Sequence, residues 1–194
     1  MYLFKDIKIR PVELSDTNSL LDIYRPYVEN TAITFEYEPP SSVDFENRIK
    51  TIKSKYPYIA AERKGSIIGY AYTSSFHVRK AYEWSAEMSI YLADEGKGFG
   101  LGRKMYEILE NISKKQGITN LYACIAVTKH EDEYLTNNSM EFHEHMGYKM
   151  VGRFTKCGYK FGRWYDMVWM EKIIADHVVN ISDIIPYSYI ELSK

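Results

Sequence analysis

A glycine-rich segment lies between an alternating stretch and a long amphipathic stretch, and this order constrains the fold more than any other feature of the chain. The glycines are Gly98, Gly100 and Gly102. Because glycine lacks a Cβ atom, successive backbone N–H groups there can turn towards one anion, and a following helix N-terminus adds partial positive charge. A diphosphate is the natural ligand of such a segment, although a turn that binds nothing explains the glycines alone equally well.

The stretches on either side of the glycines have clear periodicities. Residues 81–92 alternate between two faces, which predicts a strand. One face carries Tyr82, Trp84, Ala86, Met88, Ile90 and Leu92, and the other carries Glu83, Ser85, Glu87, Ser89 and Tyr91. After the glycines, apolar residues recur at helical spacing, which predicts a long helix that ends at Gly117. Its apolar stripe consists of Leu101, Met105, Ile108, Leu109 and Ile112.

The rest of the chain predicts one α/β domain of the α+β type. Further strands are expected at 7–10, 58–62, 67–73, 121–127, 148–154 and 164–170, and further helices after 14–16, 41–42 and 137–139. The resulting order of elements is β-α-α-β-β-β-α-β-α-β-β. We expect residues 1–174 to form the domain, and residues 175–194 to form a C-terminal tail that packs on the domain or on a partner.

Composition and charge exclude several classes of function. The net charge of -1 leaves no excess of Lys and Arg for a broad nucleic-acid surface. No apolar run approaches the roughly 20 residues that span a bilayer, and no secretory segment is visible, so we expect no membrane association and a cytoplasmic location. Cys124 and Cys157 are expected to be inert, and the five histidines show no metal-ligand spacing, so no metal is expected.

Two known phosphate-binding patterns do not fit the glycine-rich segment. A P-loop requires G-x-x-x-x-G-K-[ST], which is absent. A dinucleotide fingerprint requires G-x-G-x-x-G and an acidic residue about 20 positions later, at the end of the next strand. Here the spacing is G-x-G-x-G, and residues 121–127 contain no carboxylate. The segment is therefore not expected to bind NAD.

The segment Lys97-Gly98-Phe99-Gly100-Leu101-Gly102 resembles the [RQ]-x-x-G-x-[GA] pyrophosphate loop of GNAT acyltransferases, with Lys where Arg or Gln is usual. Four further stretches, at 34–40, 76–82, 87–91 and 158–166, resemble the phosphinothricin acetyltransferase-like subfamily. The resemblance extends over residues 7–172. It implies the GNAT fold, with a central mixed, mostly antiparallel sheet flanked by helices. It also implies an N-acetyltransferase that uses acetyl-CoA, acts on the primary amine of a small amino-acid-like molecule of the phosphinothricin or methionine sulfone type, and forms a homodimer.

Acetyl transfer to an amine needs a base, a donor to the oxyanion and a proton for the departing thiolate. Glu87 is the candidate base because it lies mid-strand about ten residues before the glycines, although an exposed Glu paired with a Lys fits the residue alone better. By resemblance, a main-chain N–H in the stretch from Ser89 to Tyr91, near Ile90, supplies the oxyanion donor. The strand, including Leu92, pairs with the pantetheine arm. His143 is the candidate proton donor, with a surface helix histidine as the alternative.

The resemblance also implies which residues bind the two substrates. The cofactor-binding set is completed by Lys97, Gly98, Phe99, Gly100, Leu101, Gly102, Arg103, Asn137 and Ser139. The chain departs from the family just before Asn137: the loop is about five residues longer and carries Thr136 where Asn is usual. Asn137 could equally be a helix N-cap. The acceptor-binding set is Phe35, His77, Arg79 and Tyr82. Arg79 suits bidentate capture of a carboxylate, whereas Phe35 and Tyr82 could equally be core residues.

Two other functions remain open at this point. The first is a GNAT enzyme that acetylates a protein N-terminus, a polyamine or an aminoglycoside, which an acidic acceptor groove would favour and Arg79 disfavours. The second is a sensor that binds acyl-CoA without turnover. A direct transfer without a covalent enzyme intermediate is expected, because no activated nucleophile is visible in the sequence.

Overall fold

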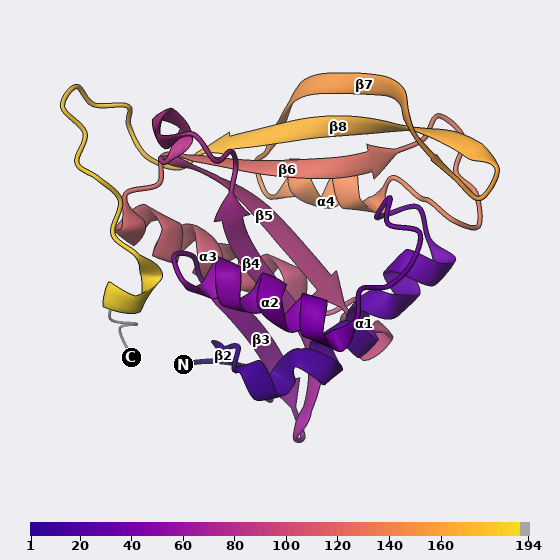
Figure 1. Ribbon diagram of the computed structural model, residues 1–194, viewed down its shortest axis with the longest axis horizontal. Coiled ribbons are helices and arrows are strands. Elements are labelled where there is room, and N and C mark those ends of the chain that lie inside the picture. The colour runs from indigo at the N-terminus through magenta and orange to yellow at the C-terminus, as the bar shows by residue number, and fades with distance from the viewer. Residues whose placement is uncertain (191–194) are drawn as a thin grey trace.

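The structure is a computed structural model that describes residues 1–190, and within them one eight-stranded sheet and four α-helices form the fold (Figure 1). The strands are β1 (Tyr2–Phe4), β2 (Ile7–Pro11), β3 (Tyr58–Arg63), β4 (Ser66–Ser75), β5 (Ser85–Leu92), β6 (Asn120–Val127), β7 (Lys149–Lys160) and β8 (Arg163–Ile173). The helices are α1 (Thr17–Asn30), α2 (Ser42–Lys53), α3 (Leu101–Gln116) and α4 (Asn138–His145).

Neighbouring strands follow the order β1-β2-β3-β4-β5-β6-β8-β7. Every pair is antiparallel except β5 with β6, which is parallel. The parallel pair follows from the connection, because α3 crosses between the end of β5 and the start of β6. This confirms the expected mixed, mostly antiparallel sheet flanked by helices.

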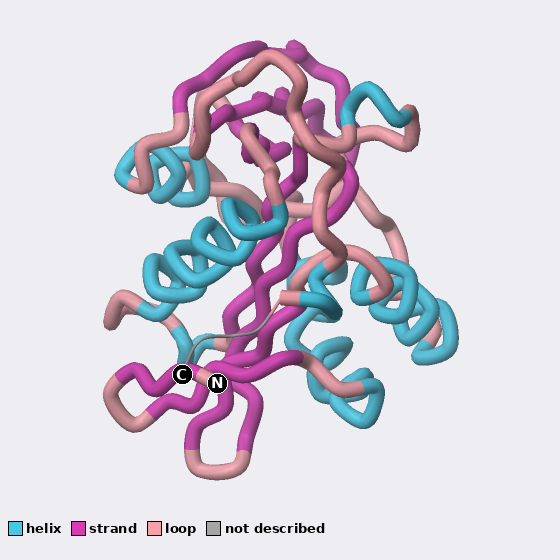
Figure 2. The backbone as a smooth tube through the Cα atoms, turned by 90° about the vertical axis from the view of Figure 1, so that its left-hand side faces the viewer, coloured by secondary structure: helices cyan, strands magenta, loops and turns pink. Residues whose placement is uncertain are grey.

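The sheet has a different set of helices on each face (Figure 2). Ala86 and Met88 of β5 pack in one apolar cluster with Met105 of α3. Tyr91 of β5 belongs to a second cluster with residues of α1 and α2, on the opposite face. Glu87 alternates with Met88 along β5, so it points to the face that α1 and α2 cover.

Helix α3 has the ends that the sequence predicts. Gly100 precedes it with a φ of 88°, and Gly117 follows it with a φ of 90°. Both values lie in the left-handed region, which glycine reaches without the steric cost that a Cβ atom imposes. The predicted long helix is therefore confirmed, with the glycine-rich segment at its N-terminus.

The strand predicted over residues 81–92 is too long by four residues. Lys80–Tyr82 form a short 3-10 turn, and β5 begins at Ser85. The polar contacts of Glu83, whose carboxylate pairs with Lys55 and with Lys80, hold this turn away from the sheet. Tyr82 therefore does not share a strand face with Ala86.

Two other elements differ in extent from the expectation. The short strand β1 pairs with β2 through a turn at Lys5, which has a φ of 55° and lacks the glycine that usually marks such turns. Strand β7 continues from the predicted end near Phe154 to Lys160, across an irregularity between Phe154 and Gly158 in its pairing with β8.

Beyond Ile174 the described chain runs along the side of the domain, as the yellow segment of Figure 1 shows. The indole of Trp84 donates to the carbonyl of Ser182 at 2.8 Å, and Ile185 and Gln116 exchange two hydrogen bonds. Ile184 is buried in the same cluster as α3. Residues 191–194 of the expected tail lie outside the described residues.

Candidate active site

Strands β5 and β6 separate halfway along their length. Their pairing runs only from Ser85 with Asn120 to Glu87 with Tyr122. Beyond Glu87, β5 stays paired with β4 as far as Leu92, and β6 stays paired with β8 as far as Val127. A small cavity of about 70 Å³ lies in the gap, lined by Met88, Ser89, Ile90, Tyr91, Cys124, Ser139 and His143 among others. The sheet is therefore open beside the candidate base.

The main chain of β5 presents alternate residues to this gap. The N–H of Ala93 donates to Ile68 on β4, whereas the carbonyl of Trp84 accepts from Thr119 and Asn120 at the start of β6. Even-numbered residues of β5 therefore direct their main-chain groups to the β6 side, and odd-numbered residues direct theirs to β4. Of the expected oxyanion donors, Ile90 thus has its N–H directed into the gap.

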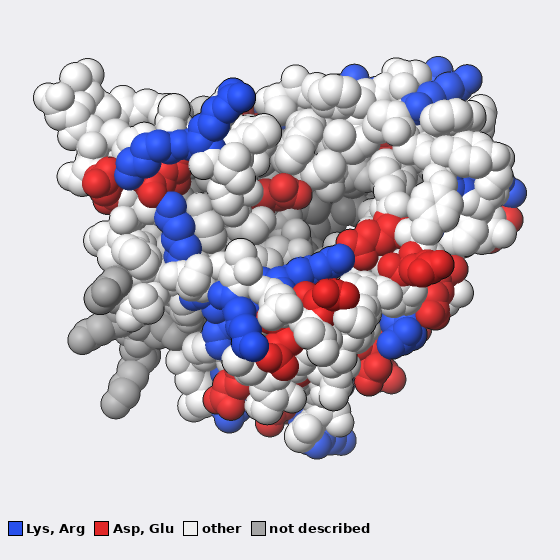
Figure 3. All heavy atoms as spheres, viewed as in Figure 1, with Lys and Arg blue, Asp and Glu red and all other residues white. Residues whose placement is uncertain are grey.

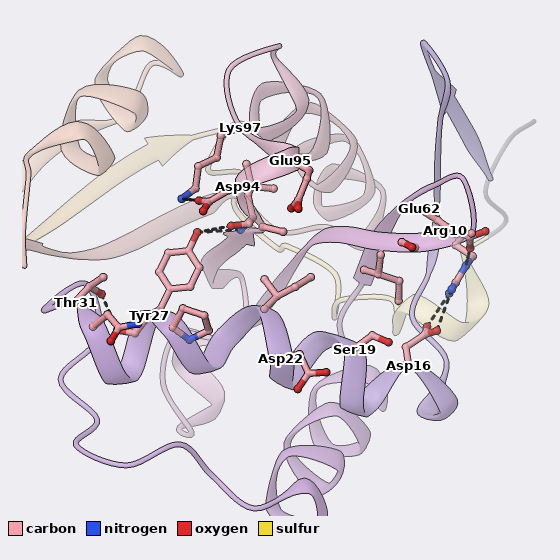
Figure 4. A pocket seen from close by; sticks show the side chains of 18 residues that line it. Arg10, Asp16, Ser19, Asp22, Tyr27, Thr31, Glu62, Asp94, Glu95 and Lys97 are labelled. Atoms are coloured by element: carbon pink, nitrogen blue, oxygen red, sulfur yellow. Dashed lines mark hydrogen bonds and ion pairs between the residues drawn. The ribbon is translucent and has the colours of Figure 1, made fainter.

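Leu92 also faces this side, but its main-chain groups are occupied. The hydroxyl of Tyr27 donates to the Leu92 carbonyl at 2.7 Å and accepts from the Leu92 N–H at 3.2 Å (Figure 4). Tyr27 reaches this position from α1. The structure therefore favours Ile90 over Leu92 as an open main-chain donor.

The glycine-rich segment forms a cradle of main-chain N–H groups at the start of α3. Gly98 and Gly100 have φ values of 86° and 88°. A Cβ atom added at Gly98 would meet nothing within 4 Å, so the backbone conformation rather than close packing requires glycine there. The first N–H groups of α3 have no partner within the helix, so they are available to an anion. Arg103 lies exposed on the first turn.

Lys97 is held at the edge of this cradle. Its ammonium group lies 2.7 Å from a carboxylate oxygen of Asp94 and 5.8 Å from the ring centre of Tyr27 (Figure 4). A cavity of about 730 Å³ adjoins Lys97 on the α1 side. Its wall carries the carboxylates of Asp16, Asp22, Glu62, Asp94 and Glu95. This cavity suits a diphosphate poorly, because like charges repel.

Glu87 is half-buried, and burial raises the pKa of its carboxyl group. Its carboxylate makes no hydrogen bond or ion pair with any residue in the range 1–190. The alternative of a strand glutamate paired with a lysine therefore does not apply within these residues. A carboxylate with a raised pKa and no fixed partner is suited to accept a proton near neutral pH.

His143 is buried rather than on the surface, with 3% of its area exposed. Its Nδ1 lies 2.6 Å from the carbonyl oxygen of Ser139, and its Nε2 lies 2.8 Å from the hydroxyl of Tyr106. A carbonyl only accepts, so Nδ1 carries the hydrogen, and Nε2 accepts the hydroxyl hydrogen of Tyr106. Burial lowers the pKa of His143 to about 4, so the ring is neutral at physiological pH.

Tyr106 is a candidate site residue that sequence reasoning missed. It lies on the buried face of α3 and lines the gap between β5 and β6 together with His143. Its position beside Met105 on the apolar stripe indicates only core packing. Burial raises the pKa of its hydroxyl, which therefore stays protonated. Within this pair, the Tyr106 hydrogen is thus directed at Nε2 of His143, and the Nδ1 hydrogen of His143 is held by the carbonyl of Ser139.

Asn137 stands at the N-terminus of α4, but its side chain does not cap the helix. Its Oδ1 accepts from the N–H of Thr128 at 3.1 Å, and its Nδ2 donates to the carbonyl of Thr128 at 3.1 Å. Both ends of the amide therefore close the loop between β6 and α4. Ser139, one turn before His143, does line the gap.

The four expected acceptor-binding residues do not form one cluster. Phe35 packs on the main chain of β7, where a Cβ atom at Gly158 would lie 2.3 Å from its ring. On the other side, the rings of His77 and Tyr82 lie 5.1 Å apart. Both rings contact Phe76, which stacks at 4.3 Å on Tyr122, the strand partner of Glu87.

Arg79 precedes the 3-10 turn, and its side chain is exposed. The face of the molecule in Figure 3 is hollowed between α2 and the strands β6 and β8, with charged groups of both signs around the hollow. The structure therefore groups His77 with Tyr82, whereas Phe35 packs on β7.

Lys160 holds the loop that carries Phe35. Its ammonium group donates to the carbonyl oxygens of Val28, Thr31 and Thr34 at 2.7–2.8 Å, and only 2% of the residue is exposed. Desolvation lowers the pKa of this lysine, so the three carbonyls rather than water solvate its charge.

We expect Lys160→Met to lower the free energy of unfolding by about 2–4 kcal/mol, because three buried or partly buried carbonyls lose their donor. Urea denaturation measures the loss, and amide hydrogen exchange should become faster in residues 31–36. Lys149→Met, at an exposed position of the same strand, is the matched control. Equal stability of the two variants would contradict a clamping role for Lys160.

Two further properties of the described chain bear on its chemistry. Residues 1–190 contain no group of three or more His, Cys, Asp or Glu side chains placed to hold a metal ion. None of their helices has the length and apolar character needed to cross a bilayer.

Comparison with known proteins places this site in a family. Residues 9–169 match the Acetyltransferase (GNAT) domain. The phosphinothricin N-acetyltransferase of Streptomyces viridochromogenes is 27% identical over 168 residues, which cover 87% of this chain and 88% of that protein. The L-methionine sulfoximine/L-methionine sulfone acetyltransferase of Pseudomonas aeruginosa is 28% identical, with coverage of 84% and 92%.

A solved structure agrees with these sequence relatives. The GNAT superfamily phosphinothricin acetyltransferase of Sinorhizobium meliloti, in complex with AcCoA, superposes with a TM-score of 0.81 at 30% identity. The match covers 94% of this chain and 98% of that one. The chain therefore belongs to the GNAT acetyltransferase family. Its expected class, an acetyl-CoA-dependent N-acetyltransferase, and its similarity to phosphinothricin acetyltransferases are confirmed.

Proposed function

We propose that the protein transfers the acetyl group of acetyl-CoA to the primary amine of a small amino-acid-like molecule of the phosphinothricin or methionine sulfone type. The relatives named for these two activities support the choice of acceptor. The observation that carries the proposal is the position of Glu87, a half-buried, unpaired carboxylate at the point where β5 and β6 separate.

The residues of the candidate site fit acetyl-CoA, the acetyl donor. The gap between β5 and β6 offers main-chain groups to an extended pantetheine arm, and the amides at 98–103 offer donors to a diphosphate. When bound, acetyl-CoA supplies an activated acetyl group as a thioester. Ser139 lines the gap, and Lys97 and Arg103 add positive charge near the cradle. Asn137 would contribute to cofactor binding indirectly, by holding the loop between β6 and α4 in place.

The chain's own groups would perform the transfer as follows. Glu87 accepts a proton from the acceptor's ammonium group, directly or through water, which frees the nitrogen lone pair for attack. The N–H of Ile90 stabilises the oxyanion of the tetrahedral transition state. The Tyr106–His143 pair lines the gap that the departing sulfur would enter, and the Tyr106 hydroxyl would turn its one hydrogen from Nε2 of His143 to that sulfur.

A direct transfer is further supported by the state of Cys124, the cysteine that lines the gap. Desolvation of its sulfur and the charge of Glu87 raise the pKa of the thiol to about 12, so it stays protonated at neutral pH and supplies no thiolate nucleophile for an acyl-enzyme. Phe35, His77, Arg79 and Tyr82 are proposed to surround the acceptor, with Arg79 binding its carboxylate.

Two broader features belong to the same proposal. A homodimer is supported by exposed apolar side chains on the outer strands, including Met150, Val151, Phe154 and Trp164. A cytoplasmic location is supported by the two cysteines, both of which are free.

The test is a spectrophotometric assay of thiol release from acetyl-CoA with phosphinothricin, methionine sulfone, common amino acids and polyamines. We expect turnover with the amino-acid-like compounds and not with the polyamines. Turnover confined to polyamines would refute the acceptor class. Binding of coenzyme A without turnover of any amine would instead identify a sensor.

A further inference from the structure

A second pocket, which none of the proposed acceptor residues lines, lies between α2 and the sheet. Its volume is about 590 Å³. Its wall contains Tyr24 of α1, Tyr58 of β3, Tyr70 and Tyr72 of β4, Tyr91 of β5 and Arg48 of α2. We call it the tyrosine pocket. Neither the resemblance nor the proposed chemistry assigns it a ligand.

The tyrosine pocket begins on the same face of the sheet as Glu87. On β4 and β5, Ser74 pairs with Glu87, and Tyr72 pairs with Ser89. Residues two apart on a strand share a face and are separated by about 7 Å. The wall formed by Tyr72 therefore lies about 7 Å from the candidate base along the strand, which is within reach of one small molecule whose amine is at Glu87.

The rings of the pocket form a rigid aromatic wall. The centres of Tyr58 and Tyr72 lie 4.6 Å apart, those of Tyr24 and Tyr91 lie 4.9 Å apart, and those of Tyr70 and Tyr91 lie 5.3 Å apart. Edge-to-face and offset contacts at these spacings are the arrangement that aromatic rings prefer. A further ring in the pocket would extend the same packing.

The pocket also contains hydroxyl groups that could hydrogen-bond to a polar substituent on a bound ring. Tyr58 and Tyr70 are only 2% and 1% exposed. Within residues 1–190 their hydroxyls have no hydrogen-bond partner, and they do not belong to the fully buried oxygens that lack one. Burial raises both pKa values well above the usual range, so these hydroxyls stay protonated and can donate. They suit a phenol or an indole N–H as well as a plain ring.

Arg48 stands at the mouth of the pocket. Its guanidinium lies 2.7 Å from Oε1 of Glu36, the residue after Phe35, while Oε2 of Glu36 is buried without a partner. This pair connects the tyrosine pocket to the loop that carries an expected acceptor residue. The tyrosine pocket therefore adjoins the loop that carries Phe35.

We propose that the tyrosine pocket binds an aryl group of the acceptor, so that the enzyme acetylates the amine of an arylethylamine framework. Aromatic amino acids and the corresponding amines without a carboxylate share this framework. The inference rests on the proposed function, because it places the acceptor's amine at Glu87.

The test compares Thr51→Trp, which fills the pocket from α2, with Val43→Trp, which adds the same side chain at an exposed position of α2 outside the pocket. The acceptors are phenylalanine, tyrosine, 2-phenylethylamine, tyramine and methionine sulfone. We expect wild type to prefer aromatic acceptors in kcat/KM by about 10-fold or more, the scale on which an apolar pocket discriminates. Thr51→Trp should remove this preference, and Val43→Trp should keep it.

The outcomes separate the two proposals. Turnover of methionine sulfone without a preference for aromatic acceptors, unaffected by Thr51→Trp, would overturn the tyrosine pocket as an aryl site and leave the proposed function intact. If no amine is turned over, the proposed function fails. Equilibrium dialysis with radiolabelled phenylalanine and tyramine then still tests the pocket, because wild type should bind one of them and Thr51→Trp should not. Equal binding by both proteins would refute the inference.

Discussion

Glu87→Gln is expected to lower kcat by about 10²–10⁴-fold, the usual contribution of a positioned general base. The substitution preserves the size of the side chain and its place on β5 but removes the group that accepts the proton. The affinity for coenzyme A should remain at the wild-type value, because the proposed donor contacts come from the main chain of β5 and from the cradle. Steady-state assays and isothermal titration measure the two quantities separately.

The pH dependence of kcat/KM provides a second readout of the same substitution. Burial raises the pKa of Glu87, and a protonated carboxyl cannot accept a proton. Wild-type activity should therefore fall as the pH decreases through that raised pKa, and the carboxyl's contribution to this limb should be absent from Glu87→Gln. Glu144→Gln, at an exposed position beside His143 in the chain, is the control. A Glu87→Gln enzyme with the wild-type rate would exclude Glu87 as the base.

Features encoded by neighbouring residues could be predicted from the sequence. Gly100 and Gly117 mark the ends of α3, because each adopts a positive φ that glycine permits. The turn between β3 and β4 likewise depends on Gly65, with a φ of 83°. In each case the chemistry of one or two residues decides the local backbone, and no distant contact is needed.

Features that depend on contacts between distant segments could not be predicted. The separation of β5 from β6 beyond Glu87 depends on the partners of each strand and leaves no mark on either sequence. The hydrogen bond between His143 and Tyr106 joins residues 37 positions apart. A histidine on a helix near Gly147 indicates equally a surface residue or a site residue. The early start predicted for β5 failed similarly, because Lys55 draws Glu83 out of the strand.

The second large effect concerns the cradle at the start of α3. We expect Gly98→Ala/Gly100→Ala to raise the Kd for coenzyme A by about 10–100-fold, since a left-handed backbone costs a non-glycine residue about 1–2 kcal/mol. The added methyl groups have room, because nothing lies within 4 Å of a Cβ at Gly98 and only Phe4 approaches one at Gly100, at 3.9 Å. The loss would therefore come from a backbone that turns its N–H groups away from the diphosphate. Isothermal titration gives the Kd.

The matched control for this double substitution is Gly152→Ala. Gly152 lies on β7 without a positive φ, and a Cβ atom added there would meet nothing within 4 Å, so alanine should leave the Kd unchanged. Comparing coenzyme A with pantetheine then isolates the cradle, because pantetheine lacks the diphosphate and can contact only the gap between β5 and β6. The double variant should weaken the binding of coenzyme A and leave the weaker binding of pantetheine unaltered. A double variant that retains the wild-type Kd for coenzyme A would show that the diphosphate is bound elsewhere, with the positively charged Lys97 and Arg103 as the first residues to test.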